Sequence, residues 1–519
     1  MRPATESGTN ETVALDTPSG RLVGVRHRGA LVFRGIPYAQ PPVGALRWRM
    51  PEPLEPWAGA RDATRFGFVC PQIPAPFDTF LGGTLSAQSE DCLYLNVFTP
   101  SPDGPKRPVM VWIHGGAFVI GAGSQSIYDG SRLAAHDVVV VTINYRLGVF
   151  GFLSLADASG GSRPGSGAEG LADQIMALHW VRRNISAFGG DPANITIFGE
   201  SAGAMSVASL LAASPAEGLF HKAILQSGAA HIGQDREQAV RVTHAILNAL
   251  SLSSQDASRA ADVPVALLLK AQTTALAAAH SGKDPKKLGR LPFQPAIDGQ
   301  VLAEKPITAL RRGSAGNIPI LIGTTRDEWK LFSAPDPRLR LMTQAAFESR
   351  LERVGGKAAP ALSSAYTASS TFDRYNDFMT DRIFAVPVER LLETRLGSAF
   401  AYRFDWRSRF LGGMFGACHA LDLGFVFGTH GDGIASAFFG KGEEAARLAD
   451  DMMRCWASFA RTGDPATTAT GLWPRYTRGE PATMVFGDGE PRSIVALERA
   501  RQEAWQDIPD EKIGLSSRT

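Results

Sequence analysis

The sequence has little of what marks a membrane protein, a nucleic-acid-binding protein or a disulfide-rich secreted domain. It contains no apolar run of about 20 residues, the length that a membrane-spanning helix needs. Its 53 basic and 51 acidic residues leave a net charge of +2, too near neutral to attract nucleic acid or an anionic membrane. Four cysteines among 519 residues are too few for a disulfide framework. We therefore expect a small-molecule partner, and neither nucleic acid nor a membrane.

The beginning of the chain also lacks the pattern of a secretory signal. Residues 1–10 are small and polar, without the apolar centre of a signal peptide. We expect a cytoplasmic protein, or a secreted one if a leader was removed. With 44% hydrophobic and 20% charged residues, the composition is otherwise that of an ordinary globular chain.

The most informative stretch that is present is Phe198-Gly199-Glu200-Ser201-Ala202-Gly203. It follows the apolar run 195–198 and precedes the helix-favouring residues 204–208, which is the strand, Gly-x-Ser-x-Gly, helix order of a nucleophile elbow. Glycines on either side of Ser201 remove the Cβ atoms that would clash in so sharp a turn. The pattern predicts a nucleophilic Ser201. An ordinary glycine-rich turn is the alternative.

A second loop is suited to stabilise negative charge. The apolar residues 109–113 predict a strand that ends at His114-Gly115-Gly116-Ala117-Phe118, where small side chains leave the backbone N–H groups accessible. Ala202 starts the predicted helix after the serine, so its N–H group faces the same place. We expect Gly116, Ala117 and Ala202 to donate to an oxyanion.

A serine nucleophile needs a base, and the base needs a carboxylate to orient it. In α/β hydrolases these follow in the order serine, acid, histidine. His419 lies in a small-residue loop before an apolar stretch, which suits a base beside a cleft. Asp327 and Glu328 both follow the buried-strand pattern of residues 320–325, at the strand end where functional side chains gather. Composition alone does not choose between the two carboxylates.

Residues 188–203 resemble the signature of the type-B carboxylesterase/lipase family, and residues 90–97 resemble that family's second signature. The similarity continues in the expected order along almost the whole chain, at residues 34–39, 41–44, 144–148, 225–228, 456–460 and 473–474. The family includes bacterial para-nitrobenzyl esterases, animal carboxylesterases, cholinesterases and the non-catalytic neuroligins.

The resemblance implies one α/β-hydrolase domain over residues 12–506. Its fold class is α/β, with a large, mostly parallel central sheet that has helices on both faces. Residues 236–290 and 341–395 would be helical insertions that roof the active-site gorge, and residues 1–11 and 507–519 would be flexible termini. We expect no metal and no organic cofactor, and either a monomer or a homodimer.

The resemblance also assigns roles to individual residues. The family's Gly-Thr-Thr-Arg-Asp-Glu stretch carries the acid on its last residue, which here is Glu328, so the implied triad is Ser201, Glu328 and His419. Glu200 would line the gorge and tune the charge near His419. Ser227 would support the acid–base pair.

Cys70 and Cys92 stand where secreted members of the family close a disulfide. Two reduced thiols are the alternative, which the missing signal peptide favours. The pairs Arg47 with Glu90 and Arg146 with Asp173 match structural ion pairs of the family.

The implied substrates are short- to medium-chain aliphatic and aryl carboxylic esters. Cholinesterases bind choline on a tryptophan that would lie between residues 70 and 92, where this sequence has none, so choline esters are disfavoured. Gly289 and Leu291 stand where two phenylalanines narrow the acyl pocket of cholinesterases, and we expect them to line a wider pocket together with Phe118. Carbamate or amide hydrolysis by the same triad is the close alternative. A non-catalytic neuroligin-like protein is disfavoured because the triad is present.

Overall fold

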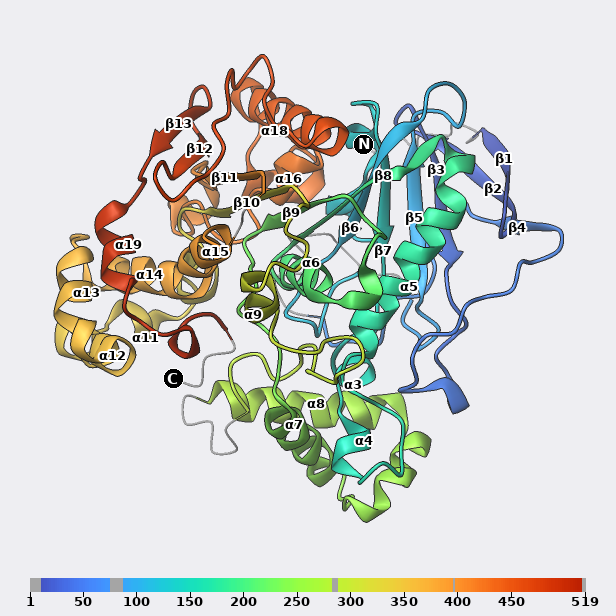
Figure 1. Cartoon of the computed structure of the whole chain (residues 1–519), viewed down its shortest axis with the longest axis horizontal. Helices are drawn as coiled ribbons and strands as arrows, with labels where there is room; N and C mark the ends of the chain where they lie inside the picture. The colour runs from blue at the N-terminus through green and yellow to red at the C-terminus, as the bar shows by residue number, and fades with distance from the viewer. Residues whose placement is uncertain (1–10, 75–86, 282–287, 395–396, 516–519) are drawn as a thin grey trace, which may run out of the picture.

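The computed structural model describes residues 11–74, 87–281, 288–394 and 397–515. A single mixed sheet crosses the molecule, from β1 and β2 at one edge to β12 and β13 at the other (Figure 1). The strand order is β1-β2-β3-β5-β7-β6-β8-β9-β10-β11-β12-β13, with β4 beside β2. The strands are β1 (Thr12–Thr17), β2 (Gly20–His27), β3 (Ala30–Pro37), β4 (Ala60–Asp62), β5 (Tyr94–Thr99), β6 (Arg107–Ile113), β7 (Val139–Ile143), β8 (Gly190–Glu200), β9 (Lys222–Gln226), β10 (Ile320–Thr325), β11 (Ala399–Phe404), β12 (Ala482–Phe486) and β13 (Arg492–Val495).

The centre of the sheet is parallel and its edges are antiparallel. Every pairing from β7 through β6, β8, β9, β10 and β11 to β12 is parallel. The strands before β7 pair antiparallel in the main path, as does β13 with β12. The carboxyl ends of the parallel strands therefore meet at one edge of the sheet, where functional loops gather in open α/β sheets.

Both faces of the sheet are buried, which explains the continuous apolar runs of its central strands. In β6, Val109 and Val111 belong to one apolar cluster, whereas Met110 and Trp112 belong to the opposite one. This alternation follows from successive side chains pointing to opposite sides of a strand. The helices α5 (Glu169–Asn184) and α6 (Ala202–Ala212) pack on the first face, and α16 (Leu423–Val426) and α18 (Glu443–Thr462) pack on the second.

Two blocks of helices extend from this body. The first holds α7 (Arg236–Ala249) and α8 (Val265–His280), which lie together at one end of the molecule (Figure 1). The second holds α12 (Gln344–Gly355), α13 (Ala359–Ala365), α14 (Thr371–Thr380) and α15 (Val386–Leu392), with a π-helical turn at Asp381–Ala385 between the last two. The second block has an apolar cluster of its own, which includes Phe347, Phe378 and Trp505.

The end of the chain differs from the flexible tail that the sequence predicts. Residues 507–515 pack onto the second helical block, with Ile508 and Ile513 buried. Asp510 forms ion pairs with Arg311 and Arg390 and contacts His231. These contacts hold the segment in place, and no pattern in residues 507–515 themselves indicates their distant partners.

The two predicted structural ion pairs are present. Arg146 and Asp173 are buried and joined by two side-chain hydrogen bonds of 2.7 and 2.8 Å. Arg47 and Glu90 form a second bidentate ion pair, whose two side chains are largely but not completely buried. Within the described part of the chain, no helix is both long enough and apolar enough to cross a bilayer.

Candidate functional site

Ser201 stands at the sharp turn between β8 and α6. Its backbone has φ 55° and ψ −122°, a conformation that only surrounding structure can impose on a residue with a side chain. Its N–H group donates to the Gln226 carbonyl (2.9 Å), and its carbonyl accepts from Met205 N–H (2.9 Å). The strain and the two bonds are what a nucleophile elbow requires, because they hold the hydroxyl away from the sheet.

The two glycines of the motif are required by close backbone approach. A Cβ atom on Gly203 would lie 2.0 Å from the Ile113 carbonyl oxygen. A Cβ atom on Gly199 would lie 2.5 Å from the Gly203 carbonyl carbon. Gly-x-Ser-x-Gly is therefore a packing requirement of strands β6 and β8 and helix α6 at this turn.

The predicted oxyanion loop lies beside Ser201. A Cβ atom on Gly115 would lie 3.1 Å from the Ser201 Cβ atom, which places the loop against the nucleophile. Gly116 and Ala117 both have positive φ angles, of 105° and 53°. Among the described residues, no backbone acceptor is recorded for the N–H groups of Gly116, Ala117 or Ala202. Their role as donors to an oxyanion stays a prediction.

Buried contacts hold this loop in shape. The His114 ring stacks on Tyr145 with a centroid distance of 4.5 Å, and its Nδ1 atom lies 2.8 Å from the Gly115 carbonyl oxygen. Burial lowers the pKa of His114 to about 4, so the ring is neutral near pH 7. These contacts show that His114 stabilises the conformation of the loop. The structure gives no reason to assign it as the catalytic base.

Glu328 and His419 meet although 91 residues separate them in the chain. His419 Nδ1 lies 2.6 Å from Glu328 Oε2, and the Thr325 N–H group donates to Glu328 Oε1 (2.8 Å). Asp327 points elsewhere: it pairs with Lys330 and Arg326 and accepts from Ala417 N–H. The structure thus separates the two adjacent carboxylates that composition leaves equivalent.

A second carboxylate approaches the same imidazole. His419 Nε2 lies 3.0 Å from Oε1 of Glu200, although the contact is not aligned as a hydrogen bond. Burial lowers the pKa of His419, but Glu200 and Glu328 outweigh it and raise the pKa to about 9. Burial raises the pKa of Glu200 to about 8, against the attraction of His419. The site therefore stabilises an imidazolium strongly.

Two phenylalanines that sequence patterns did not single out pack on His419. The centroid of Phe384, in the π-helical turn, lies 4.7 Å from that of the imidazole, and the centroid of Phe332 lies 5.3 Å from it. Phe384 is buried, whereas 47% of Phe332 is exposed. Phe332 therefore presents an apolar surface to solvent beside the base. Its position four residues after Glu328 was the only signal in the sequence.

Asp422 is a further buried acid close to His419. Its Oδ2 atom accepts hydrogen bonds from Gln226 and from the Tyr402 hydroxyl, both 2.9 Å long. Burial raises the pKa of Asp422 to about 6. Asp422 follows His419 by three residues, a spacing that would have pointed to a shared neighbourhood.

Ser227 is buried, with φ 51°, and its N–H group donates to the Gly323 carbonyl (2.8 Å). Within the described ranges, its hydroxyl has no recorded hydrogen-bond partner. Its support of the acid–base pair stays a prediction.

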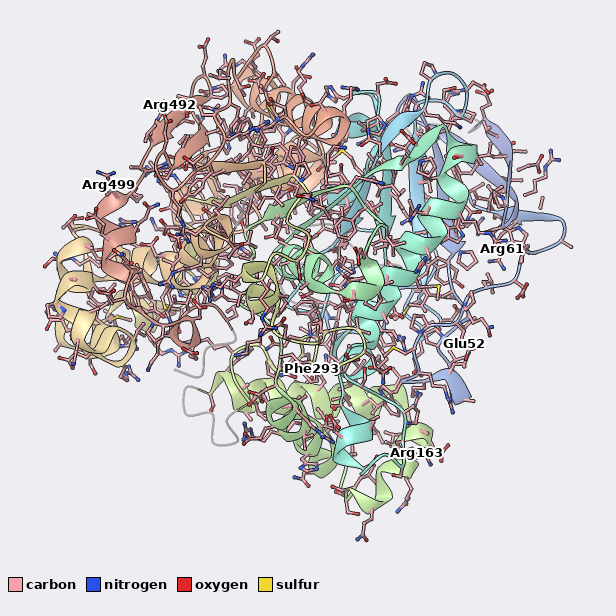
Figure 2. All side chains as sticks on the ribbon, in the orientation of Figure 1. Glu52, Arg61, Arg163, Phe293, Arg492 and Arg499 are labelled. Atoms are coloured by element: carbon pink, nitrogen blue, oxygen red, sulfur yellow. The ribbon has the colours of Figure 1, made fainter. Side chains whose placement is uncertain are left out.

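Of the predicted substrate-pocket residues, Phe118 and Leu291 are buried and Gly289 is half-buried. Phe118 is fully buried and packs edge-on against Phe152, with 5.2 Å between ring centroids. Leu291 is buried, and its carbonyl accepts a hydrogen bond from Gln294. Gly289 has φ 78°. Phe293 lies inside the molecule, whereas Arg492 and Arg499 lie at its periphery (Figure 2). Lining of the acyl pocket by Gly289 and Leu291 stays a prediction.

Cys70 and Cys92 are both buried and free. A hydrogen bond with Cys70, together with burial, raises the pKa of the Cys92 thiol. Leu147 N–H donates to Cys70 Sγ (3.2 Å). The two thiols are thus neighbours, as the family resemblance implies, but no disulfide joins them in this structure. Residues 75–86 of the loop between them, part of the segment in which cholinesterases carry their choline-binding tryptophan, lie outside the described residues.

No three histidine, cysteine, aspartate or glutamate side chains of the described segments converge in a way that could hold a metal ion.

Comparison with known proteins gives a consistent result. A family model described as "Carboxylesterase family" matches residues 11–505. The para-nitrobenzyl esterase of Bacillus subtilis (strain 168) is 42% identical over 477 residues, which cover 91% of this chain and 94% of that protein. The phenmedipham hydrolase of Pseudarthrobacter oxydans is 35% identical over 486 residues, with the same two coverages.

Solved structures match over nearly the full length as well. A structure titled PNB esterase superposes with a TM-score of 0.82 at 40% identity, and the match covers 95% of this chain and 99% of that one. The carboxylesterase EST55 of Geobacillus stearothermophilus superposes with a TM-score of 0.84 at 40% identity, covering 95% of this chain and 100% of that one.

Proposed function

This chain belongs to the carboxylesterase family and is a carboxylic ester hydrolase, and on that premise we propose that Ser201, Glu328 and His419 carry the reaction. The observation that supports this assignment best is the 2.6 Å contact between Glu328 and His419, made beside the strained Ser201 turn. A histidine oriented by a buried carboxylate is what a serine nucleophile needs.

In the proposed mechanism, His419 takes the proton of the Ser201 hydroxyl as its oxygen attacks the ester carbonyl. The N–H groups of Gly116, Ala117 and Ala202 stabilise the tetrahedral oxyanion, and each is worth about 2.7–4 kcal/mol of barrier lowering. His419 then protonates the leaving alcohol. A water molecule, deprotonated by the same imidazole, cleaves the acyl-enzyme.

The two acids near His419 have different parts in this scheme. Glu328 orients the imidazole through Nδ1, which leaves Nε2 for proton transfer. Glu200 lies 3.0 Å from that Nε2 atom and, when ionised, adds negative charge, which stabilises the imidazolium formed as the serine reacts. Phe332 and Phe384 cover the ring and reduce its access to water.

We further propose short- to medium-chain aliphatic and aryl esters as substrates, because Leu291 and Gly289 leave more room than two aromatic rings would. Ser201→Ala tests the assignment of the nucleophile. It is expected to lower turnover of para-nitrophenyl butyrate by about 10⁶-fold without loss of stability, since it removes no buried packing. Retention of more than about a thousandth of the wild-type rate would exclude Ser201 as the nucleophile. A parallel assay with para-nitroanilide and carbamate analogues measures whether amide or carbamate bonds are cleaved by the same triad.

A further inference from the structure

A cavity of about 110 Å³ lies outside the proposed active site. It is partly open to solvent and is bounded by β10, β11, α15 and α19 (Arg499–Trp505), and its walls include Thr325, Val388, Glu389, Tyr402, Tyr476 and Arg501. We call this space the α15 cavity. Ser201, Glu328 and His419 are not among its lining residues. Arg499, which begins α19, lies at the outer edge of the molecule, so this wall of the cavity borders the surface (Figure 2).

The cavity nevertheless shares two wall residues with the supports of the active site. The Thr325 N–H group donates to Glu328 Oε1. The Tyr402 hydroxyl donates to Asp422, which lies near His419. The cavity therefore lies directly behind the residues that hold the acid and the base.

The three arginines that line the cavity are each engaged with carboxylates. Arg403 pairs with Asp405 (2.6 Å) and Glu498 (3.1 Å). Arg501 pairs with Asp377 (2.6 Å) and approaches Glu498 (3.6 Å). Arg326 pairs with Asp327 (3.2 Å) and approaches Asp405. The positive charges in the wall are thus compensated before any ligand enters.

Two of the acids in the wall, Glu389 and Asp381, are compensated less well than Glu498. No hydrogen bond or ion pair is recorded within the described residues for the carboxylate of Glu389. Burial, together with the neighbouring Glu393 and Asp381 and against the attraction of Arg390, raises the pKa of Glu389 to about 8. Asp381 accepts a hydrogen bond from Tyr366 (2.8 Å), and burial raises its pKa to about 7. A cation would offset the cost of ionising Glu389 in this place.

The remaining wall is apolar and aromatic. Val388 and Leu392 lie on α15 beside Glu389. Burial, followed by the charges of Glu389 and Glu393, raises the pKa of Tyr476, which places the phenol near the free carboxylate. An aromatic face next to a carboxylate suits an organic cation. The volume is below the roughly 150 Å³ of a cavity that holds benzene, whose six carbon atoms set the scale, so a ligand of about four or five non-hydrogen atoms fits.

We propose that the α15 cavity binds a small organic ammonium ion, with its nitrogen on Glu389 and its alkyl group against Val388, Leu392 and Tyr476. The site is distinct from the ester site and does not depend on the reaction proposed for it. Its selectivity follows from the wall: a neutral molecule of the same shape gains the apolar contacts but not the ion pair.

Calorimetric titration with n-butylammonium, at a pH above about 8 where Glu389 is ionised, tests the proposal. Glu389→Gln is expected to weaken binding at least tenfold, because it removes the charge but keeps the shape. Glu393→Gln is the matched control, since it removes an exposed carboxylate at the end of the same helix, and it is expected to leave affinity within about twofold. Butan-1-ol, the neutral isostere, is expected to bind at least tenfold more weakly than n-butylammonium.

Two further variants distinguish binding in the α15 cavity from cation binding elsewhere on the protein. Glu200→Gln keeps the α15 cavity intact, so affinity is expected to be unchanged; a loss there would place the ion in the gorge and overturn the proposal. Leu392→Trp fills the cavity while keeping Glu389, and it is expected to abolish binding. Equal affinity in Glu389→Gln or Leu392→Trp, equal affinity for butan-1-ol, or no measurable binding by the wild-type protein would each refute the site.

Discussion

The Nε2 atom of His419 lies 3.0 Å from Oε1 of Glu200, the residue that directly precedes Ser201. The proposed base is therefore held between two carboxylates, because Glu328 occupies its Nδ1 side at 2.6 Å. This arrangement stabilises the charged imidazole, whereas proton abstraction from Ser201 requires the neutral one. The Glu200 carboxylate thus has two opposite effects on catalysis. It stabilises the His419 imidazolium that forms during the reaction, and it lowers the population of the neutral imidazole that must first accept the Ser201 proton.

The first prediction follows from this conflict. Glu200→Gln removes one source of the raised pKa of His419, so the neutral imidazole forms at lower pH. The acid limb of the kcat/KM profile is expected to move to lower pH, while kcat on its plateau falls because the imidazolium loses a partner. The pH dependence of para-nitrophenyl butyrate hydrolysis measures both effects. An acid limb that moves to higher pH, or does not move, would show that Glu200 does not set the protonation of His419.

A second prediction separates the adjacent carboxylates. Glu328→Gln is expected to lower kcat by about 10³–10⁴-fold, because the imidazole loses its orienting acceptor. Asp327→Asn keeps that contact and loses only charge toward Lys330 and Arg326, so it should lower the thermal midpoint while kcat stays within about tenfold. Kinetics and thermal denaturation of both variants provide the test, and a larger kcat loss for Asp327→Asn would reverse the assignment.

The third prediction concerns the phenylalanine that packs on the base. Phe384→Leu should lower both stability and kcat, since it loosens the imidazole as well as the core. Phe378→Leu is a matched control: it is equally buried in the same helical block but stacks on Trp505. Both changes are expected to cost about 0.5–3 kcal/mol of stability, and only Phe384→Leu should reduce kcat at temperatures where both variants are folded. Equal kcat in the two variants would show that Phe384 supports the fold alone.

The fourth prediction concerns the acyl pocket. If Leu291 lines it, butyrate and hexanoate esters are preferred over acetate, at about 0.8 kcal/mol or up to fourfold in kcat/KM for each buried methylene. Leu291→Phe refills the space and should shift the preference toward acetate. The ratio of kcat/KM across para-nitrophenyl acetate, butyrate, hexanoate and octanoate measures the shift in both proteins. An unchanged chain-length profile would place Leu291 outside the pocket and leave the triad untouched.

Local sequence determined the parts of this protein that depend on neighbouring residues. The turn at Ser201 and the glycines around it are specified by one strand, one turn and one helix, so their pattern is readable without the rest of the fold. The same holds for the strand and glycine loop that end at Gly116 and Ala117. The resemblance to the family added the acid and the base, Glu328 and His419, to these local predictions. Composition alone does not choose between Glu328 and Asp327 as the acid.

Tertiary structure decided what depends on contacts between distant segments. Glu200, Glu328 and His419 converge because β8, β10 and the loop after β11 end at the same edge of the sheet, and the raised pKa of His419 exists only once they do. Phe384 reaches the imidazole from a π-helical turn, a local irregularity that no hydrophobic period indicates. The polar composition of residues 507–515 predicts a flexible segment, yet Asp510 forms ion pairs with arginines on α9 (Pro306–Arg311) and α15. Asp510 is separated from each of these arginines by more than a hundred residues, so their ion pairs form only in the folded chain.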